Sequence, residues 1–203
     1  MTIDEIMRTA PVIPVLVLDG ECDWAELAET LVDAGLPVLE VTLRTTGALA
    51  AIREMSSVAG AIVGAGTVLH EHQLDDALAA GSRFIVSPGL TEPLAKAAAR
   101  ANVPYLPGVA TAGDIMRGLD LGLDRFKFFP AEASGGIAAL KALSGPFADV
   151  RFCPTGGIRV GSASDWLALP CVLCVGGTWL YPGEDSSLKA VAQRARDAAS
   201  LRQ

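Results

Sequence analysis

The sequence predicts an α/β fold in which residues 1–203 form one domain, a single (β/α)8 barrel of the TIM-barrel type. The chain has 203 residues, and a complete barrel needs roughly 200 to 250. Its composition is 51% hydrophobic and only 19% charged, which suits strands that are buried on both faces beneath a layer of helices. Short apolar runs recur about every 20 to 27 residues and alternate with Ala-rich segments of helical periodicity, as in repeated βα units.

Each apolar run is short enough to be one buried strand. The runs span residues 12–18, 37–43, 61–66, 83–87, 104–108, 125–130, 150–156 and 171–177. These eight signals favour a closed barrel with eight helices, because an open doubly wound sheet would usually have about five or six strands. The clearest helical segments span residues 24–34, 73–80, 92–101, 115–121 and 188–199.

The charge pattern narrows the class of partner. The net charge is -7 and no basic run is present, so nucleic acid is a poor candidate partner. The first residues carry acids where a secretory signal needs basic residues, so we expect a cytoplasmic protein. An uncharged window at 166–183 approaches membrane-spanning length, but prolines and glycines interrupt it, and we interpret it as a strand plus a loop.

The use of cysteine and histidine predicts neither a disulfide framework nor a metal site. We expect buried, reduced thiols at all four cysteines, which are Cys22, Cys153, Cys171 and Cys174. Cys171 and Cys174 would point to opposite faces of a strand. His70 and His72 would not share one face of a helix. A metal-dependent reaction therefore lacks ligands in this sequence.

Lys127 is the strongest candidate for a reactive side chain. The other three lysines fall in predicted helices, where a solvated charge is the ordinary interpretation. Lys127 lies between Phe126 and Phe128 in a predicted strand, whose alternation would point it into the barrel. Burial disfavours the ammonium form and so favours a neutral amine that can add to a ketone. The alternative is a structural lysine that extends to the barrel mouth or pairs with a carboxylate.

Glu40 is an acid in the middle of an otherwise apolar strand run. It is either the partner of Arg44 or Lys127 in a buried ion pair or an acid/base group beside a Schiff-base amine. Arg44 and Thr67 follow neighbouring strands and can clamp a substrate carboxylate through the guanidinium and the hydroxyl. Taken alone, each of these two residues is equally well a helix cap or a surface charge.

Two Gly-Gly turns follow the last two strand runs, within residues 155–157 and 176–178. Paired glycines let backbone amides approach an anion closely, and phosphate sites after the seventh and eighth strands are frequent in β/α barrels. The two turns therefore predict a phosphate site. The alternative is a pair of simple tight turns.

Six sequence blocks, taken together, closely resemble one enzyme family over nearly the whole chain. They are LEVTLRT (39–45), IVGAGTVL (62–69), SPGLTEPL (87–94), FKFFPAE (126–132), GPFADVRFCPTGGI (145–158) and VLCVGGTWL (172–180). The family is that of 2-keto-3-deoxy-6-phosphogluconate (KDPG) and 4-hydroxy-2-oxoglutarate aldolases, which includes the lysine-dependent aldolase of the Entner-Doudoroff pathway. The resemblance implies a β/α barrel, usually a homotrimer, without a metal or an organic cofactor.

The same resemblance implies roles for individual residues. Lys127 looks like the Schiff-base lysine and Glu40 like the general acid/base. Arg44 and Thr67 resemble the binders of the pyruvyl carboxylate, and Pro88 resembles a residue that lines that pocket. The residues that resemble the phosphate-binding set are Thr155, Gly156, Gly157 and Thr178. Thr178 stands where serine is expected, so the hydroxyl is kept and the extra methyl can change the affinity.

The implied reaction is the cleavage of 2-keto-3-deoxy-6-phosphogluconate to pyruvate and glyceraldehyde 3-phosphate. Residues 107–114 are smaller and less polar than is usual in the family, which keeps two related substrates open: 4-hydroxy-2-oxoglutarate and the galactonate epimer. In a different class, the chain would be a barrel that binds a phosphorylated metabolite without covalent chemistry, as a sensor or an isomerase. Such a protein needs no buried neutral amine at Lys127.

Overall fold

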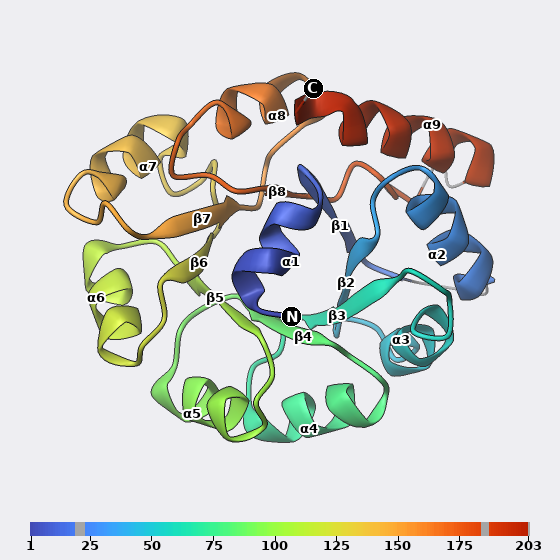
Figure 1. The fold of residues 1–203 in the computed structure, drawn as a ribbon, viewed down its shortest axis with the longest axis horizontal. Coiled ribbons are helices and arrows are strands. Elements are labelled where there is room, and N and C mark those ends of the chain that lie inside the picture. The colour runs from blue at the N-terminus through green and yellow to red at the C-terminus, as the bar shows by residue number, and fades with distance from the viewer. Residues whose placement is uncertain (19–22, 184–186, 203) are drawn as a thin grey trace.

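The chain folds as a β/α barrel, and the predicted fold class is confirmed (Figure 1). The computed structural model describes residues 1–18, 23–183 and 187–202. Eight parallel strands follow one another in the order β7-β6-β5-β4-β3-β2-β1-β8. Parallel bridges from Phe152 to Val172 and from Thr155 to Gly176 connect the two ends of this series, so that the sheet closes into a ring.

The strands are short and lie close to the apolar runs of the sequence. They are β1 (Val12–Leu16), β2 (Val38–Thr42), β3 (Ile62–Gly66), β4 (Phe84–Ser87), β5 (Tyr105–Val109), β6 (Arg125–Phe128), β7 (Arg151–Pro154) and β8 (Val175–Gly177). The largest difference concerns β8, which was predicted to start at residue 171. It starts later because Val172 still bridges to β7, and the chain pairs with β1 only from Val175 onward.

Helices cover the outside of the ring between successive strands (Figure 1). They are α2 (Trp24–Asp33), α3 (Ala48–Met55), α4 (Glu71–Ala79), α5 (Glu92–Arg100), α6 (Ala112–Asp120), α7 (Gly136–Ser144), α8 (Val160–Leu167) and α9 (Leu188–Ala199), with a 3-10 turn η1 (Ser200–Arg202) after α9. The five predicted helical segments correspond to α2, α4, α5, α6 and α9. Helix α6 begins before the predicted residue 115 because Thr111 and Asp114 form a capping box that fixes its start.

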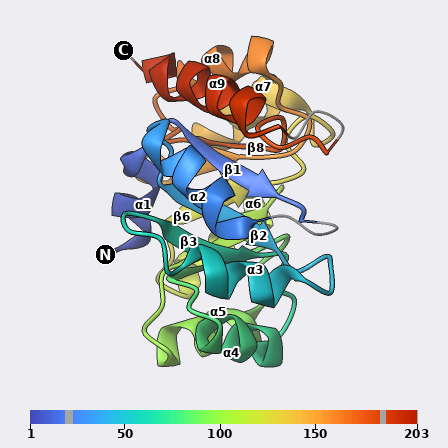
Figure 2. The ribbon, with the colours of Figure 1, turned by 90° about the vertical axis from the view of Figure 1, so that its right-hand side faces the viewer.

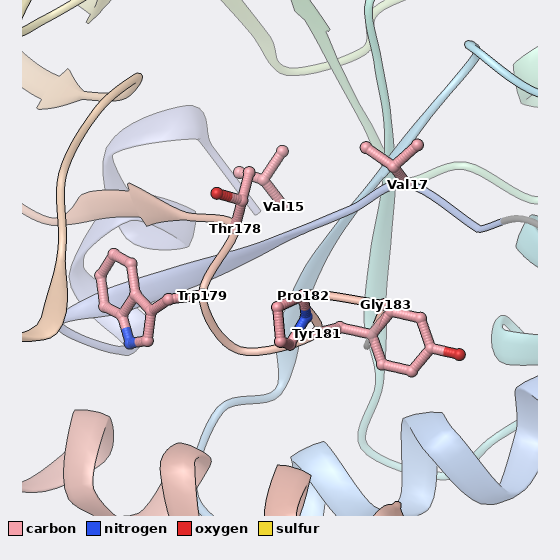
Figure 3. A pocket seen from close by; sticks show the side chains of 7 residues that line it. All are labelled: Val15, Val17, Thr178, Trp179, Tyr181, Pro182 and Gly183. Atoms are coloured by element: carbon pink, nitrogen blue, oxygen red, sulfur yellow. The ribbon is translucent and has the colours of Figure 1, made fainter. Parts of the chain in front are cut away.

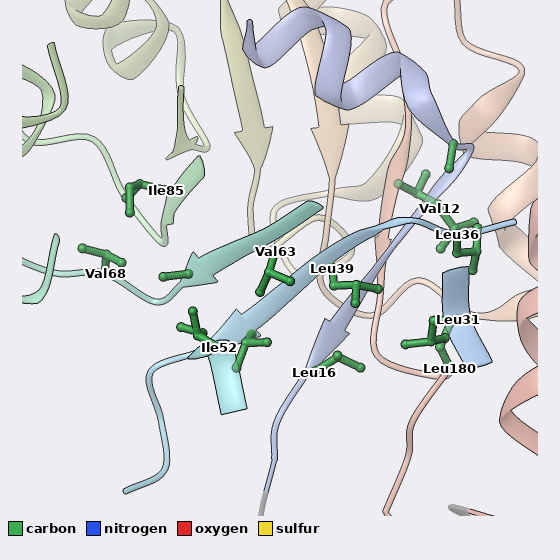
Figure 4. Packing of buried hydrophobic residues seen from close by; sticks show 14 of the residues in the cluster. Val12, Leu16, Leu31, Leu36, Leu39, Ile52, Val63, Val68, Ile85 and Leu180 are labelled. Atoms are coloured by element: carbon green, nitrogen blue, oxygen red, sulfur yellow. The ribbon is translucent and has the colours of Figure 1, made fainter. Parts of the chain in front are cut away.

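An apolar layer between strands and helices holds the ring together (Figure 4). Leu16, Leu39 and Val63 point outward from β1, β2 and β3, and they pack with helical residues such as Leu31 and Ile52. All five side chains are fully buried, and each such burial contributes about 1.5 to 3 kcal/mol. Because this outer layer provides much of the stability, part of the inner face of the strands is available for polar groups.

A further helix, α1 (Ile3–Thr9), closes the barrel at the N-terminal ends of the strands. Figure 2 shows α1 on the side from which the arrow of β1 departs. A second apolar cluster, the inner core, lies inside the barrel and includes Phe84 and Leu106 of the strands. Ile6 and Met7 of α1 are buried in this inner core. The expectation of eight helices missed α1, although Thr2 and Glu5 form a capping box at its start. Since one end of the barrel is plugged, a substrate can reach the interior only from the opposite end.

The prediction of four buried thiols is wrong for one cysteine. Cys153 and Cys174 are buried, but Cys171 is partly exposed because it lies in the turn before β8 and not in a strand. Cys22 lies outside the described residues. Among the residues that the structure describes, no cluster of His, Cys, Asp and Glu could hold a metal ion.

The uncharged window at 166–183 contains the end of α8, strand β8 and the turns that follow. Within the described ranges 1–18, 23–183 and 187–202, no helix combines the length and the apolar character needed to cross a bilayer.

The plug helix α1 is tied to the barrel wall by an ion pair, which gives a pH-dependent prediction. Asp4 of α1 accepts hydrogen bonds from Arg8 and, at 2.5 Å, from Arg125 of β6, and these bonds hold the pKa of Asp4 below its usual value. The stabilisation is therefore complete above a pH of about 4 and is lost as the pH falls through the lowered pKa. We expect Asp4→Asn to lower the free energy of unfolding by about 1 kcal/mol at neutral pH, because the pair is partly exposed.

Urea denaturation at several pH values measures this effect. The difference between wild type and Asp4→Asn should shrink as the pH falls below about 4. Asp75→Asn, at an exposed carboxylate on α4, is the control for the loss of one charge. A difference that stays constant down to pH about 2 would show that the Asp4 carboxylate does not stabilise the plug.

Candidate active site

The centre of the site is an ion pair between Lys127 on β6 and Glu40 on β2. Lys127 Nζ lies 2.9 Å from Glu40 Oε1, and the two residues are only 6% and 3% exposed. Three strands separate β2 from β6 in either direction around the ring, so the pair spans the barrel interior. The sequence left Arg44 and Lys127 open as partners of Glu40, and the structure places Glu40 with Lys127.

Inward-facing glycines provide the space for this pair. Gly108 is the register partner of Lys127 on one side, and Gly64 is a register partner of Glu40. At Gly66 an added Cβ would lie 2.3 Å from Glu40 Oε1, so any larger residue would displace the carboxylate. A glycine inside a strand marks such a close approach. The glycines of the β3 run are therefore a sequence signal for the close approach of the Glu40 carboxylate.

Lys127 is almost completely buried, with one aromatic ring close to its amine. Phe126 and Phe128 are fully buried in the outer apolar layer, and the ring centre of Phe129 lies 5.4 Å from Lys127 Nζ. Because both groups are almost completely buried, an isolated ammonium or carboxylate would be costly at this depth. Each charge of the pair therefore depends on the other, and Lys127 Nζ donates the hydrogen bond to Glu40 Oε1.

Arg44 and Thr67 meet at the barrel mouth, after β2 and β3. Arg44 Nε donates a hydrogen bond to Thr67 Oγ1 at 3.2 Å, and Arg44 is exposed. Thr67 has a φ of 59°, which is a genuine outlier for a β-branched residue. Strain of this kind persists where surrounding contacts enforce it, and it clusters at functional sites. Pro88 follows β4 on the same rim and is partly exposed.

The two Gly-Gly turns lie side by side, as a shared anion site requires. A parallel bridge joins Thr155 to Gly176, and Gly156 and Gly157 have φ values of 103° and 82°. Within the part of the chain that the structure describes, the backbone amides of Gly156 and Gly157 donate no hydrogen bond. These amides are therefore available to an anion. Thr178 is exposed beside them.

Glu132 supports the Gly156–Gly157 turn and was missed at the sequence level. The Glu132 amide donates to Gly156 O at 3.0 Å, and Glu132 Oε1 accepts from Trp166 Nε1 at 3.2 Å. A Cβ at Gly157 would lie only 2.7 Å from Glu132 Cβ. The only signal in the sequence was the position of Glu132 shortly after Lys127.

A hollow of about 460 Å³ opens at the mouth between the end of β1 and the segment after β8 (Figure 3). Its walls are formed by Val15, Val17, Thr178, Trp179, Tyr181, Pro182 and Gly183. Lys127 and Glu40 do not line it, but Val15 is the register partner of Glu40 on β1. The hollow therefore extends from the Gly-Gly turns to the strand next to the ion pair.

Comparison with known proteins identifies the family. The family described as KDPG and KHG aldolase matches residues 3–193. The chain belongs to this family. Among its relatives, the KHG/KDPG aldolase of Escherichia coli K12 is 49% identical over 205 residues, which cover 98% of this chain and 96% of that protein.

Two solved structures of aldolases from this family extend the comparison. The 2-keto-3-deoxy-6-phosphogluconate aldolase of Zymomonas mobilis ZM4, crystallised with 3-phosphoglycerate, is 53% identical with a TM-score of 0.96 and covers 99% of this chain and 96% of its own. The KDPG aldolase of Legionella pneumophila is 42% identical with a TM-score of 0.94, and the match covers 98% of this chain and 99% of the Legionella chain. The Legionella structure holds pyruvate captured at low pH as a covalent carbinolamine.

The strained backbone at Thr67 gives a prediction that separates strain from side-chain chemistry. Thr67→Ala and Thr67→Gly both remove the hydroxyl that accepts from Arg44, but only glycine tolerates a φ of 59°. We expect the glycine variant to be more stable than the alanine variant by about 1 kcal/mol. Both variants should bind pyruvate more weakly by a similar factor, about 3- to 10-fold.

Chemical denaturation and the inhibition constant of pyruvate measure the two effects separately. Equal stability of the two variants would mean that the backbone at Thr67 is not strained. Wild-type affinity for pyruvate in both would contradict the role in binding the pyruvyl carboxylate that the family resemblance implies for Thr67.

Proposed function

We propose that this protein is a Schiff-base (class I) aldolase that cleaves 2-keto-3-deoxy-6-phosphogluconate to pyruvate and glyceraldehyde 3-phosphate. A single domain carries the reaction at the C-terminal mouth of the barrel. The observation that supports this best is the buried pair of Lys127 and Glu40, 2.9 Å apart, between candidate anion-binding groups on two sides of the mouth. An amine and a carboxylate in direct contact are the two groups that Schiff-base chemistry needs.

Lys127 forms the covalent bond to the substrate. Its proton passes to Glu40 through the existing hydrogen bond, and the neutral amine attacks the C2 ketone to give a carbinolamine. Glu40 gives that proton to the carbinolamine hydroxyl, which leaves as water, and the resulting iminium withdraws electrons from the C3–C4 bond. Lys127 thereby makes a carbon-carbon bond breakable without a metal.

Glu40 moves the protons of the later steps. Through a water molecule, its carboxylate removes the proton of the C4 hydroxyl while the C3–C4 bond breaks, and glyceraldehyde 3-phosphate leaves. The electron pair of the broken bond remains on the Lys127-bound fragment as an enamine. Glu40 then returns a proton to C3, and hydrolysis of the resulting iminium releases pyruvate and restores the amine.

The two ends of the substrate are held by different groups. Arg44 and Thr67 bind the pyruvyl carboxylate, and Pro88 lines the pocket around it. The free amides of Gly156 and Gly157 bind the phosphate together with the hydroxyls that flank the two Gly-Gly turns, those of Thr155 and Thr178. The chemistry calls for neither a metal nor an organic cofactor, and we propose that the protein acts as a cytoplasmic homotrimer.

A second activity of the same site is supported by one relative. The Escherichia coli protein that is 49% identical carries the name KHG/KDPG aldolase. We therefore propose 4-hydroxy-2-oxoglutarate as a slower substrate, because it offers the same 2-keto acid to Lys127 and has no phosphate. The galactonate epimer of the phosphorylated sugar acid differs from the main substrate only at C4.

Steady-state kinetics on the three substrates test the proposal, with pyruvate release as the readout. We expect kcat/KM to be highest for the phosphorylated gluconate substrate and lower by about 10- to 100-fold for 4-hydroxy-2-oxoglutarate, which lacks charge-assisted hydrogen bonds to the phosphate site. Thr178→Val, at an exposed position, is the matched variant. It should lower kcat/KM for the phosphorylated substrate and leave that for 4-hydroxy-2-oxoglutarate unchanged.

Each part of the proposal has its own contrary outcome. Absence of pyruvate from all three substrates would exclude the aldolase. Equal kcat/KM values with and without a phosphate would exclude the phosphate site while leaving the Schiff-base chemistry in place.

A further inference from the structure

We propose that Tyr105 is a positioning residue that holds the turn after β4 in place from behind the barrel wall, and with it Pro88 in the pyruvyl pocket. This inference rests on the proposed function, because Pro88 belongs to the pocket assigned there. Tyr105 lies on β5, is 4% exposed, and matches none of the groups that the reaction itself uses.

A chain of hydrogen bonds connects Tyr105 to the turn. Ser87 Oγ lies 2.7 Å from Gly89 O and 2.7 Å from the Tyr105 hydroxyl. A carbonyl oxygen can only accept, so the Ser87 hydroxyl donates to Gly89 O and must accept from Tyr105. Burial raises the pKa of Tyr105 to about 12, so the phenol keeps its proton at any pH at which the protein works. The Ser87 bond spans Pro88 and closes the turn around it.

The arrangement places Pro88 and Tyr105 on opposite sides of the same wall. Tyr105 belongs to the outer apolar layer, whereas Val86 belongs to the inner core. Because side chains alternate along β4, Ser87 points outward with Tyr105. The carbonyl oxygen of Pro88 lies instead over the inward-facing side of Gly108. The turn is therefore held from outside, by groups that a substrate does not contact.

The backbone of β5 presses against the same turn. A Cβ at Gly108 would lie 2.1 Å from the carbonyl oxygen of Pro88, and Gly108 is the register partner of Lys127. The position of Pro88 is thus set relative to the strand pair that carries the Schiff-base lysine. A shift of the turn would change the pyruvyl pocket without moving the ion pair of Lys127.

The Tyr105 hydroxyl is a polar group in a buried position, so it needs a hydrogen-bond partner. A phenylalanine would fill the same apolar space, and a buried hydroxyl is unfavourable unless it is hydrogen-bonded. The Tyr105 hydroxyl is satisfied by Ser87. Removing it leaves the Ser87 hydroxyl with a single partner, so the turn becomes less fixed.

Kinetics of Tyr105→Phe test this inference. We expect KM and the inhibition constant of pyruvate to rise about 3- to 10-fold, as for the loss of one hydrogen bond, while kcat stays within about 2-fold. Ser87→Ala, which keeps Tyr105, should show the same pattern: KM and the inhibition constant of pyruvate rise while kcat is nearly unchanged. If Tyr105 acts only through Ser87, the double variant will be no worse than Ser87→Ala alone.

Ser56→Ala is the matched control, because Ser56 Oγ also donates to the carbonyl oxygen of a glycine, Gly81. It should leave both constants at wild-type values. Unchanged constants in Tyr105→Phe, or additive losses in the double variant, would overturn the positioning role. Wild-type protein without aldolase activity would instead refute the proposed function, so the two failures are distinguishable.

Discussion

The ion pair between Lys127 and Glu40 is the constraint to which the rest of the structure is adapted. Two charges that are almost completely buried are costly to desolvate, and their attraction compensates only when the contact is good. The barrel provides this contact by carrying the two residues on opposite strands, β6 and β2. It provides room for them with glycines on the inner face. Stability comes largely from elsewhere, from the outer apolar layer and from the plug helix α1.

The same constraint explains the organisation of the mouth. The chain carries a net charge of -7, so its overall field repels an anionic substrate. Local groups must overcome this repulsion, and the groups proposed for this lie on two sides of the ring: Arg44 and Thr67 after β2 and β3, and the Gly-Gly turns after β7 and β8. The strain at Thr67 and the free amides at Gly156 and Gly157 are the structural features that such binding groups would require.

The barrel, its strands and the central pair follow from the sequence to different degrees. The apolar runs predicted the eight strands because burial on both faces leaves a clear pattern. Lys127 was the strongest candidate because a lysine between phenylalanines in a strand has few explanations, and its role stays a prediction. Helix α1 was missed because its pattern is short, and Cys171 was misplaced because the start of β8 depends on which neighbour the chain pairs with. Strand pairing of this kind is decided by tertiary contacts, which leave no local signal in the sequence.

Contacts between distant residues were the part of the site that the sequence could not provide. Nothing local couples Tyr105 to Ser87, or Gly66 to Glu40, since each contact depends on the register of neighbouring strands. The family resemblance supplied roles for nine residues, but not the geometry that lets Glu40 reach Lys127 and not Arg44. The structure adds that geometry and the supporting residues behind it.

Trapping with pyruvate and sodium borohydride, followed by peptide mass spectrometry, tests the central claim most directly. The account predicts one reduced pyruvyl adduct, on the peptide that carries Lys127, with the same yield in the presence of EDTA. The other three lysines of the chain serve as internal controls. Absence of an adduct on folded protein, or an adduct on one of those three lysines, would contradict the Schiff-base role of Lys127.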